Sequence, residues 1–241
     1  MWKNGQICIG LPEENDYLEV KKMANTVLNK ILDGKIIAIV RGIPSEDVVD
    51  LAKALVKGGI NCIEVTFDQS SEEKAKDTLK AISNICNALG DQVCVGAGTV
   101  MSVEQVDAAV AAGAEYMISP NTDAAVIART KELGKISIPG AMTPTEVASA
   151  YAMGADIVKM FPAGVLGCGY IKAVKAPLKH IPVTAVGGVN PENCADFIRA
   201  GCVGVGVGGN LVSPQFVKEV RFDEITAIAQ SYTDALNQEG R

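Results

Sequence analysis

The sequence predicts a (β/α)8 TIM barrel, an α/β fold, from three features of its pattern. From residue 36 onward, short β-branched runs alternate with longer helical patterns. Eight such units follow one another at a spacing of roughly 20–25 residues, which suits parallel strands joined by helices. The strands are apolar on both faces, as expected when helices cover the outside of a sheet and side chains fill its inside. Eight units of this kind close into a barrel.

The strand candidates are short and regularly spaced. In chain order they are Ile36–Val40, Cys62–Thr66, Val93–Gly96, Tyr116–Ile118, Ile136–Ile138, Ile157–Lys159, Val183–Val186 and Val203–Val207. The helices between them carry boundary signals. Ser45 and Ser102 suit the N-cap position, and Gly58 and Gly113 suit the C-terminal stop. The segment Thr143–Glu146 reads as a capping box with proline at the first helical position.

One more amphipathic helix is expected before the barrel, over residues 16–33, where it would close the lower end of the barrel. The barrel itself is expected over about residues 36–238. No linker or low-complexity segment interrupts the pattern, and 241 residues is near the usual size of this fold. We therefore predict a single domain over residues 1–241.

Composition narrows the possible partners. The 22 basic and 28 acidic residues give a net charge of −6 without a basic cluster, so we expect no nucleic-acid partner. The sequence has no run of about eighteen apolar residues, so we expect no membrane-spanning helix. The first residues lack the apolar core of a signal peptide. The seven cysteines contain no C-x-x-C pair, which favours a reduced, cytoplasmic protein.

The sequence contains one histidine, His180, in a polar connection where a surface position is expected. Zinc catalysis usually needs two or three histidines or closely spaced cysteines. A serine or cysteine triad would have to depend on His180. We therefore expect neither a metal site nor a cofactor.

In a (β/α)8 barrel the active site lies at the carboxyl ends of the strands, and Lys159 ends the sixth predicted strand. Its neighbours are apolar, and burial lowers the pKa of an amine toward the neutral, nucleophilic form. Such an amine can attack a 2-oxo acid to give an imine. The alternatives are a lysine that extends its ammonium group to water and one that pairs with an acid for structure.

Three further polar residues lie at strand ends. Alternation along the second strand places Glu64 inside the barrel, where it could move protons or form a buried salt bridge. Arg41 could hold a carboxylate through two hydrogen bonds, or simply lie at the barrel rim. Thr99 could present its hydroxyl and N–H to an anion.

Two glycine pairs, Gly187–Gly188 and Gly208–Gly209, follow the last two strands. The loops at these positions are the common phosphate site of this fold, although tight turns alone also require glycine. The run from Gly204 to Gly209 imitates a dinucleotide fingerprint. A terminal helix follows it, however, rather than the strand and acidic residue that a dinucleotide fold requires.

Five segments resemble those of the 2-keto-3-deoxy-6-phosphogluconate (KDPG)/4-hydroxy-2-oxoglutarate (KHG) aldolase family. The likeness covers about residues 20–235, and its motifs occur in the family's order and spacing. They are Gly59–Phe67 around Glu64, Val95–Val100, Ile118–Pro120, Ile138–Gly140 and Gly154–Ala163 around Lys159.

The resemblance implies a metal-independent class I aldolase, a lyase. Its substrate would be a 2-keto-3-deoxy-6-phospho sugar acid, cleaved to pyruvate and glyceraldehyde 3-phosphate, or 4-hydroxy-2-oxoglutarate, cleaved to pyruvate and glyoxylate. Lys159 would form the imine, Glu64 would move protons, and Arg41 with Thr99 would hold the carboxylate. The other substrate-binding positions implied are Pro120, Phe161, Gly187, Gly188, Gly208, Gly209 and Asn210. Family members are commonly trimers, which implies a homotrimer.

The chain departs from the family pattern in four places. Asp68 stands where many members have a carboxylate-binding arginine, so Arg41 would have to replace it. Val186 replaces a threonine, and Asn210 replaces a serine near the phosphate. Met160 replaces a leucine or phenylalanine, on the expected outward face. These changes leave two alternatives, a sugar-phosphate isomerase or epimerase and a barrel that binds a phosphorylated metabolite without turnover.

Overall fold

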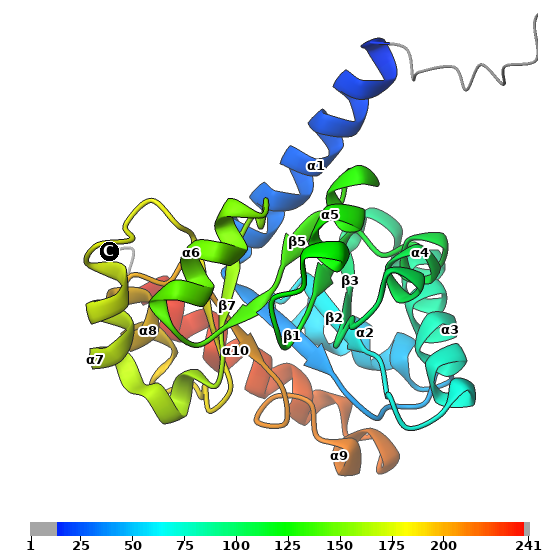
Figure 1. Ribbon diagram of the computed structural model, residues 1–241. Helices are drawn as coiled ribbons and strands as arrows, with labels where there is room; N and C mark the ends of the chain where they lie inside the picture. The colour runs from blue at the N-terminus through cyan, green and yellow to red at the C-terminus, as the bar shows by residue number, and fades with distance from the viewer. Residues whose placement is uncertain (1–13, 239–241) are drawn as a thin grey trace, which may run out of the picture.

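The computed structural model describes residues 14–238, which form a nearly closed barrel of parallel strands surrounded by helices (Figure 1). The strands of this part of the chain are β1 (Ile36–Val40), β2 (Cys62–Thr66), β3 (Cys94–Gly98), β4 (Tyr116–Ile118), β5 (Ile136–Ile138), β6 (Gly140–Ala141), β7 (Val158–Met160), β8 (Val183–Val186) and β9 (Gly204–Val207). They are ordered β5-β4-β3-β2-β1-β9-β8-β7-β6 in the sheet. The predicted barrel is confirmed.

The helices alternate with the strands, and most of them pack against the outside of the barrel. They are α1 (Glu14–Gly34), α2 (Val48–Lys57), α3 (Glu72–Leu89), α4 (Val103–Ala111), α5 (Ala124–Glu132), α6 (Pro144–Ala152), α7 (Ala163–Lys175), α8 (Cys194–Arg199), α9 (Pro214–Lys218) and α10 (Phe222–Asn237), with a short 3₁₀ turn η1 (Gly90–Gln92). No helix among these residues has the length and apolar character needed to cross a bilayer.

The barrel closes around Pro139, which separates β5 from β6. β5 pairs with β4 at one end of the sheet, and β6 pairs with β7 at the other. The Lys159 N–H donates to the Pro139 carbonyl across this junction, at 2.8 Å. β5 has the predicted bounds of the fifth strand, and the structure adds the short strand β6 after Pro139. Proline has no N–H to continue a ladder, so the two strands stay separate.

Helix α1 closes the amino-terminal end of the barrel, as predicted. Val27 and Ile31 on its inner face pack against apolar residues at the starts of the strands, including Ile37, Cys62 and Ile136. Figure 1 shows α1 continuing beyond the barrel on this side. The opposite, carboxyl-terminal end is therefore the open one.

The predicted helix boundaries hold with one exception. The Ser102 side chain caps α4, and Thr143 forms the expected capping box with Glu146. Ser45 is not an N-cap, however, because α2 begins three residues later with Asp47 at that position. The backbone of Ser45 bonds to two side chains of α3 instead, so the turn is tied to the neighbouring helix.

Candidate active site

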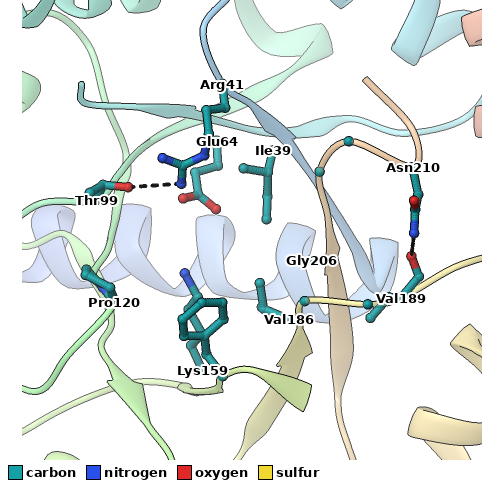
Figure 2. Close-up of a pocket in the computed structure, with 15 residues that line it drawn as sticks. Ile39, Arg41, Glu64, Thr99, Pro120, Lys159, Val186, Val189, Gly206 and Asn210 are labelled. Atoms are coloured by element: carbon teal, nitrogen blue, oxygen red, sulfur yellow. Dashed lines mark hydrogen bonds between the residues drawn. The ribbon is translucent and has the colours of Figure 1, made fainter. Parts of the chain in front are cut away.

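One cavity of about 380 Å³ opens at the carboxyl ends of the strands (Figure 2). Its lining includes all the site residues that the sequence indicated, namely Arg41, Glu64, Thr99, Pro120, Lys159, Phe161, Gly187, Gly188, Gly208, Gly209 and Asn210. The structure thus brings together residues from seven of the eight strand–loop units. This follows from the fold, since parallel strands in a barrel all end at the same rim.

Lys159 lies inside the barrel because of the alternation along β7. Val158 and Met160 point outward into the layer between sheet and helices, as predicted for Met160, and Lys159 faces the cavity. Its side chain is 7% exposed, and its Nζ lies 5.1 Å from the centre of the Phe161 ring. Burial lowers the pKa of Lys159; the charge of Glu64 opposes this effect, and the charge of Arg41 reinforces it.

Glu64 occupies the corresponding inner position on β2, with Ile63 and Val65 packed outward as predicted. Its side chain is 1% exposed, and burial raises its pKa despite the nearby charges of Lys159 and Arg41. Figure 2 shows its carboxylate between the Arg41 guanidinium and the Lys159 amine. In residues 14–238, no direct ion pair joins Glu64 to Lys159, so a structural salt bridge does not explain this pair.

Strand β3 makes room for Glu64 by having no side chain beside it. A Cβ atom at Gly98 would lie 1.8 Å from Glu64 Oε1. A Cβ at Gly96 would lie 2.1 Å from the buried ring of Tyr116 on β4. Neither position can hold even alanine without displacing the neighbouring side chain.

Arg41 and Thr99 lie together at the mouth of the cavity. The Arg41 guanidinium donates to Thr99 Oγ1 at 3.3 Å, and Figure 2 shows the guanidinium next to the Glu64 carboxylate. An exposed arginine beside a hydroxyl suits a carboxylate ligand. Asp68 does not take part, because it lies outside this cavity and pairs with Lys74 at 2.9 Å. The hydrogen bonds from Lys74 and Ser70 hold the Asp68 pKa well below its usual range.

The loops after β8 and β9 form the opposite wall. Gly187 and Gly188 have φ angles of 93° and 75°, in the left-handed region that favours glycine. The Asn210 amide donates to the Val189 carbonyl at 2.8 Å and so joins the two loops. One N–H of that amide is used in this bond, and the other remains available to a ligand.

The cavity also has an apolar wall, and part of it was missed in the sequence. Ile39, Val186 and Val189 line it together with Gly206. A Cβ atom at Gly206 would lie 2.8 Å from Val186 Cγ2 and 3.3 Å from Ile39 Cδ1. Strand alternation could have identified Ile39, because it lies two residues before Arg41 and on the same face.

Comparison with known proteins gives the family. The model of the KDPG and KHG aldolase family matches residues 27–228. The chain belongs to this family. The aldolase is 37% identical to 2-dehydro-3-deoxy-6-phosphogalactonate aldolase of Escherichia coli over 83% of its own length and 96% of the relative's. It is 36% identical to 2-dehydro-3-deoxy-phosphogluconate aldolase of Treponema pallidum, over 77% and 85% of the two chains.

A solved structure supports the type of chemistry. The KDPG aldolase of Legionella pneumophila, with pyruvate captured as a covalent carbinolamine, superposes with a TM-score of 0.77 at 26% identity. It covers 86% of the aldolase and 97% of that chain. The expectation of a class I aldolase of the KDPG type is confirmed. Enzymes of this class are lyases that use an amine in place of a metal ion.

Proposed function

We propose that the aldolase cleaves a 2-keto-3-deoxy-6-phospho sugar acid to pyruvate and glyceraldehyde 3-phosphate. The observation that carries this proposal is the buried Lys159 amine, which faces Glu64 in a cavity with a cationic mouth and a glycine-rich far wall. The smaller 4-hydroxy-2-oxoglutarate, cleaved to pyruvate and glyoxylate, fits the same arrangement without using the far wall.

The reaction would begin at Lys159. Its neutral Nζ attacks the C2 carbonyl, and loss of water from the resulting carbinolamine leaves a protonated imine. Glu64 removes the proton of the C4 hydroxyl, directly or through water. The C3–C4 bond then breaks, its electron pair passes into the imine as an enamine, and the aldehyde departs. Protonation of C3 and hydrolysis of the imine release pyruvate and restore the free amine.

Binding groups at both ends of the cavity would fix the substrate. Arg41 and Thr99 would hold the carboxylate next to C2. Backbone N–H groups of Gly187, Gly188, Gly208 and Gly209, with the Asn210 amide, would receive the phosphate. The reacting carbons then lie over Lys159, between the two anion sites.

A coupled assay with lactate dehydrogenase tests the function, because an aldolase releases pyruvate from these substrates, whereas an isomerase, an epimerase or a binding protein does not. The two C4-epimeric phospho-sugar acids, gluconate and galactonate, are compared with 4-hydroxy-2-oxoglutarate at equal enzyme concentration. Thermal stabilisation by a phospho-sugar acid without pyruvate release would instead indicate a binding protein. Turnover without pyruvate would indicate an isomerase or epimerase.

Of the two epimers, we propose the galactonate form as the preferred substrate. Val186 presents methyl groups to the cavity where the family pattern has a threonine hydroxyl, and the E. coli relative named for the galactonate epimer covers more of this chain than the T. pallidum relative. Val186, the side chain that we expect to distinguish the two configurations at C4, thus differs from the threonine of the family.

Val186→Thr is expected to move this preference toward the gluconate epimer. Threonine keeps the shape of valine and adds one hydroxyl to the cavity wall. One hydrogen bond is worth about 1 kcal/mol, so the ratio of the two kcat/KM values should change roughly three- to tenfold. Steady-state kinetics on both epimers measure the ratio. Val189→Thr, on the same wall, is the matched control, and an equal change there would show that C4 is not read at position 186.

We also propose that the aldolase is a cytoplasmic homotrimer. Large apolar side chains are exposed on or beside α6 and α7, including Met142, Met153 and Val165, the last of them 83% exposed. Six cysteines in residues 14–238 are unpaired thiols, which suits a reducing compartment. Light scattering in solution is expected to give three times the chain mass, and a monomer mass at micromolar concentration would contradict the trimer.

A further inference from the structure

Thr99 has a backbone conformation that its side chain disfavours. Its φ angle is 55°, in the left-handed region, where β-branched residues are rare because their side chains crowd the backbone. Such a conformation persists only where the surrounding structure holds it. Since Thr99 lines the active-site cavity, whatever holds its backbone also sets the direction of its hydroxyl.

Two glutamine side chains hold the Thr99 turn from outside the barrel, and together they are called the amide clamp. Gln69, in the loop after β2, donates from Nε2 to the Thr99 carbonyl at 2.7 Å. Gln105, on the first turn of α4, accepts from the Met101 N–H at 2.7 Å. Gln105 Nε2 also donates to Gln69 Oε1 at 2.9 Å. The clamp thus satisfies the backbone groups on both sides of Val100.

Val100 is fixed independently, from inside the fold. Its N–H donates to the Ile118 carbonyl at 3.1 Å, and its carbonyl accepts from Ser119 Oγ at 2.7 Å. These bonds tie the turn to β4 whether or not the clamp is present. Loss of the clamp should therefore leave the chain folded and free the peptide of Thr99 to rotate.

Rotation of the Thr99 peptide would disturb the contact between its hydroxyl and Arg41. Thr99 Oγ1 accepts from Arg41 at 3.3 Å, and the two residues form the proposed carboxylate site (Figure 2). A turn relaxed to an ordinary φ would redirect the hydroxyl and remove the acceptor that orients the exposed guanidinium. Gln69 comes directly after Asp68, the position at which the family pattern has a carboxylate-binding arginine.

We propose that Gln69 and Gln105 are positioning residues that act through Thr99 to form the site for the substrate carboxylate. The inference rests on the proposed function. In this chain the loop after β2 serves the carboxylate indirectly, by holding Thr99, instead of supplying a cation of its own.

The test compares Gln69→Ala, Gln69→Glu and Gln105→Ala with the unmodified enzyme. Gln69→Glu keeps the size of the side chain but removes the N–H group that donates a hydrogen bond to the Thr99 carbonyl. Each variant is expected to raise KM for the phospho-sugar acid about five- to tenfold, as for loss of one ordinary hydrogen bond, with kcat changed less than about twofold. Gln215→Ala is the matched control, because the exposed Gln215 amide on α9 bonds to Glu219 and lies outside the cavity. The KM of this variant should be unchanged.

A double-mutant cycle separates positioning from general destabilisation. In a Thr99→Ala background, Gln69→Ala should add almost nothing to the rise in KM, because its route to the substrate is already lost. Independent, additive effects, or a fall in kcat that follows a fall in Tm, would overturn the proposal. So would an unchanged KM in the single variants.

Trapping with pyruvate distinguishes this proposal from the function beneath it. Cyanoborohydride and saturating pyruvate should give a Lys159 adduct by mass spectrometry in the unmodified enzyme and in the clamp variants alike. If the unmodified enzyme gives no adduct, the proposed function fails and the clamp's role fails with it. An adduct in the unmodified enzyme together with an unchanged KM in Gln69→Ala would reject the clamp alone.

Discussion

Lys159→Ala is expected to lower kcat/KM for the phospho-sugar acid by a factor of roughly 10⁴ or more, since the imine through which the carbon–carbon bond breaks can no longer form. Among residues 14–238, Lys159 is the only lysine that lines the active-site cavity, and the variant removes its amine. The variant should still fold. Lys159 is buried without an ion-pair partner in the described part of the chain, and burying an ammonium group costs free energy, so its removal takes no stabilising ion pair from the barrel. The coupled assay measures the loss, and circular dichroism checks the fold.

Two further lysine variants make this result specific. Lys159→Arg keeps a positive charge near Glu64 but offers no amine for an imine, and it should be as inactive as Lys159→Ala. Lys53→Ala removes an exposed lysine that pairs with Asp50 on α2 and should leave activity unchanged. Full activity in Lys159→Ala, or a cyanoborohydride adduct on another lysine, would refute the assignment of the nucleophile.

Glu64→Gln is expected to lower kcat by a factor of roughly 10² to 10⁴, the usual contribution of a positioned acid–base group. Glutamine has the same shape, so it fits beside Gly98, but it cannot accept the proton of the C4 hydroxyl. KM should change little, because the carboxylate site at Arg41 and Thr99 is untouched. Glu73→Gln, on the exposed face of α3, is the matched control. A kcat equal to that of the unmodified enzyme would remove Glu64 from the mechanism.

The same variant should also move the pH profile. Burial lowers the Lys159 pKa, the charge of Arg41 lowers it further, and the charge of Glu64 raises it against the larger effect of burial. Its loss should lower that pKa further, so the neutral amine persists to lower pH. The rate of pyruvate trapping by cyanoborohydride should therefore begin to rise at a lower pH in Glu64→Gln. A shift to higher pH would contradict this electrostatic coupling.

Local pattern was enough to predict the barrel, because each strand is a short apolar run and each helix carries its own boundary signals. Pro139 and Ser45 show where local pattern fails. The strands on either side of Pro139 pair at opposite ends of the sheet, and Ser45 is drawn away from its capping role by contacts with α3. Pro139 marks a break in the sequence, but which strand each side pairs with, like the contacts of Ser45, is a tertiary property.

The candidate site shows the same division. Rim residues such as Lys159 and Glu64 could be predicted because the fold fixes where strands end, and strand alternation fixes which way they point. The amide clamp could not, since Gln69 lies 30 residues from Thr99 and 36 residues from Gln105 along the chain. The sequence does not show which glutamine side chains bond to a distant backbone group and which bond only to water.

The missing side chains of β3 have a consequence for protein engineering. Gly96 and Gly98 are the positions where Tyr116 and Glu64 take the space that a Cβ atom would need. A mutant library that varies these two codons would consist mostly of damaged barrels. Ile39 and Val186 line the same cavity from the opposite side, and their side chains can be exchanged for others of similar volume. Selection for new aldehyde products should therefore diversify the Ile39–Val186 wall and hold β3 constant.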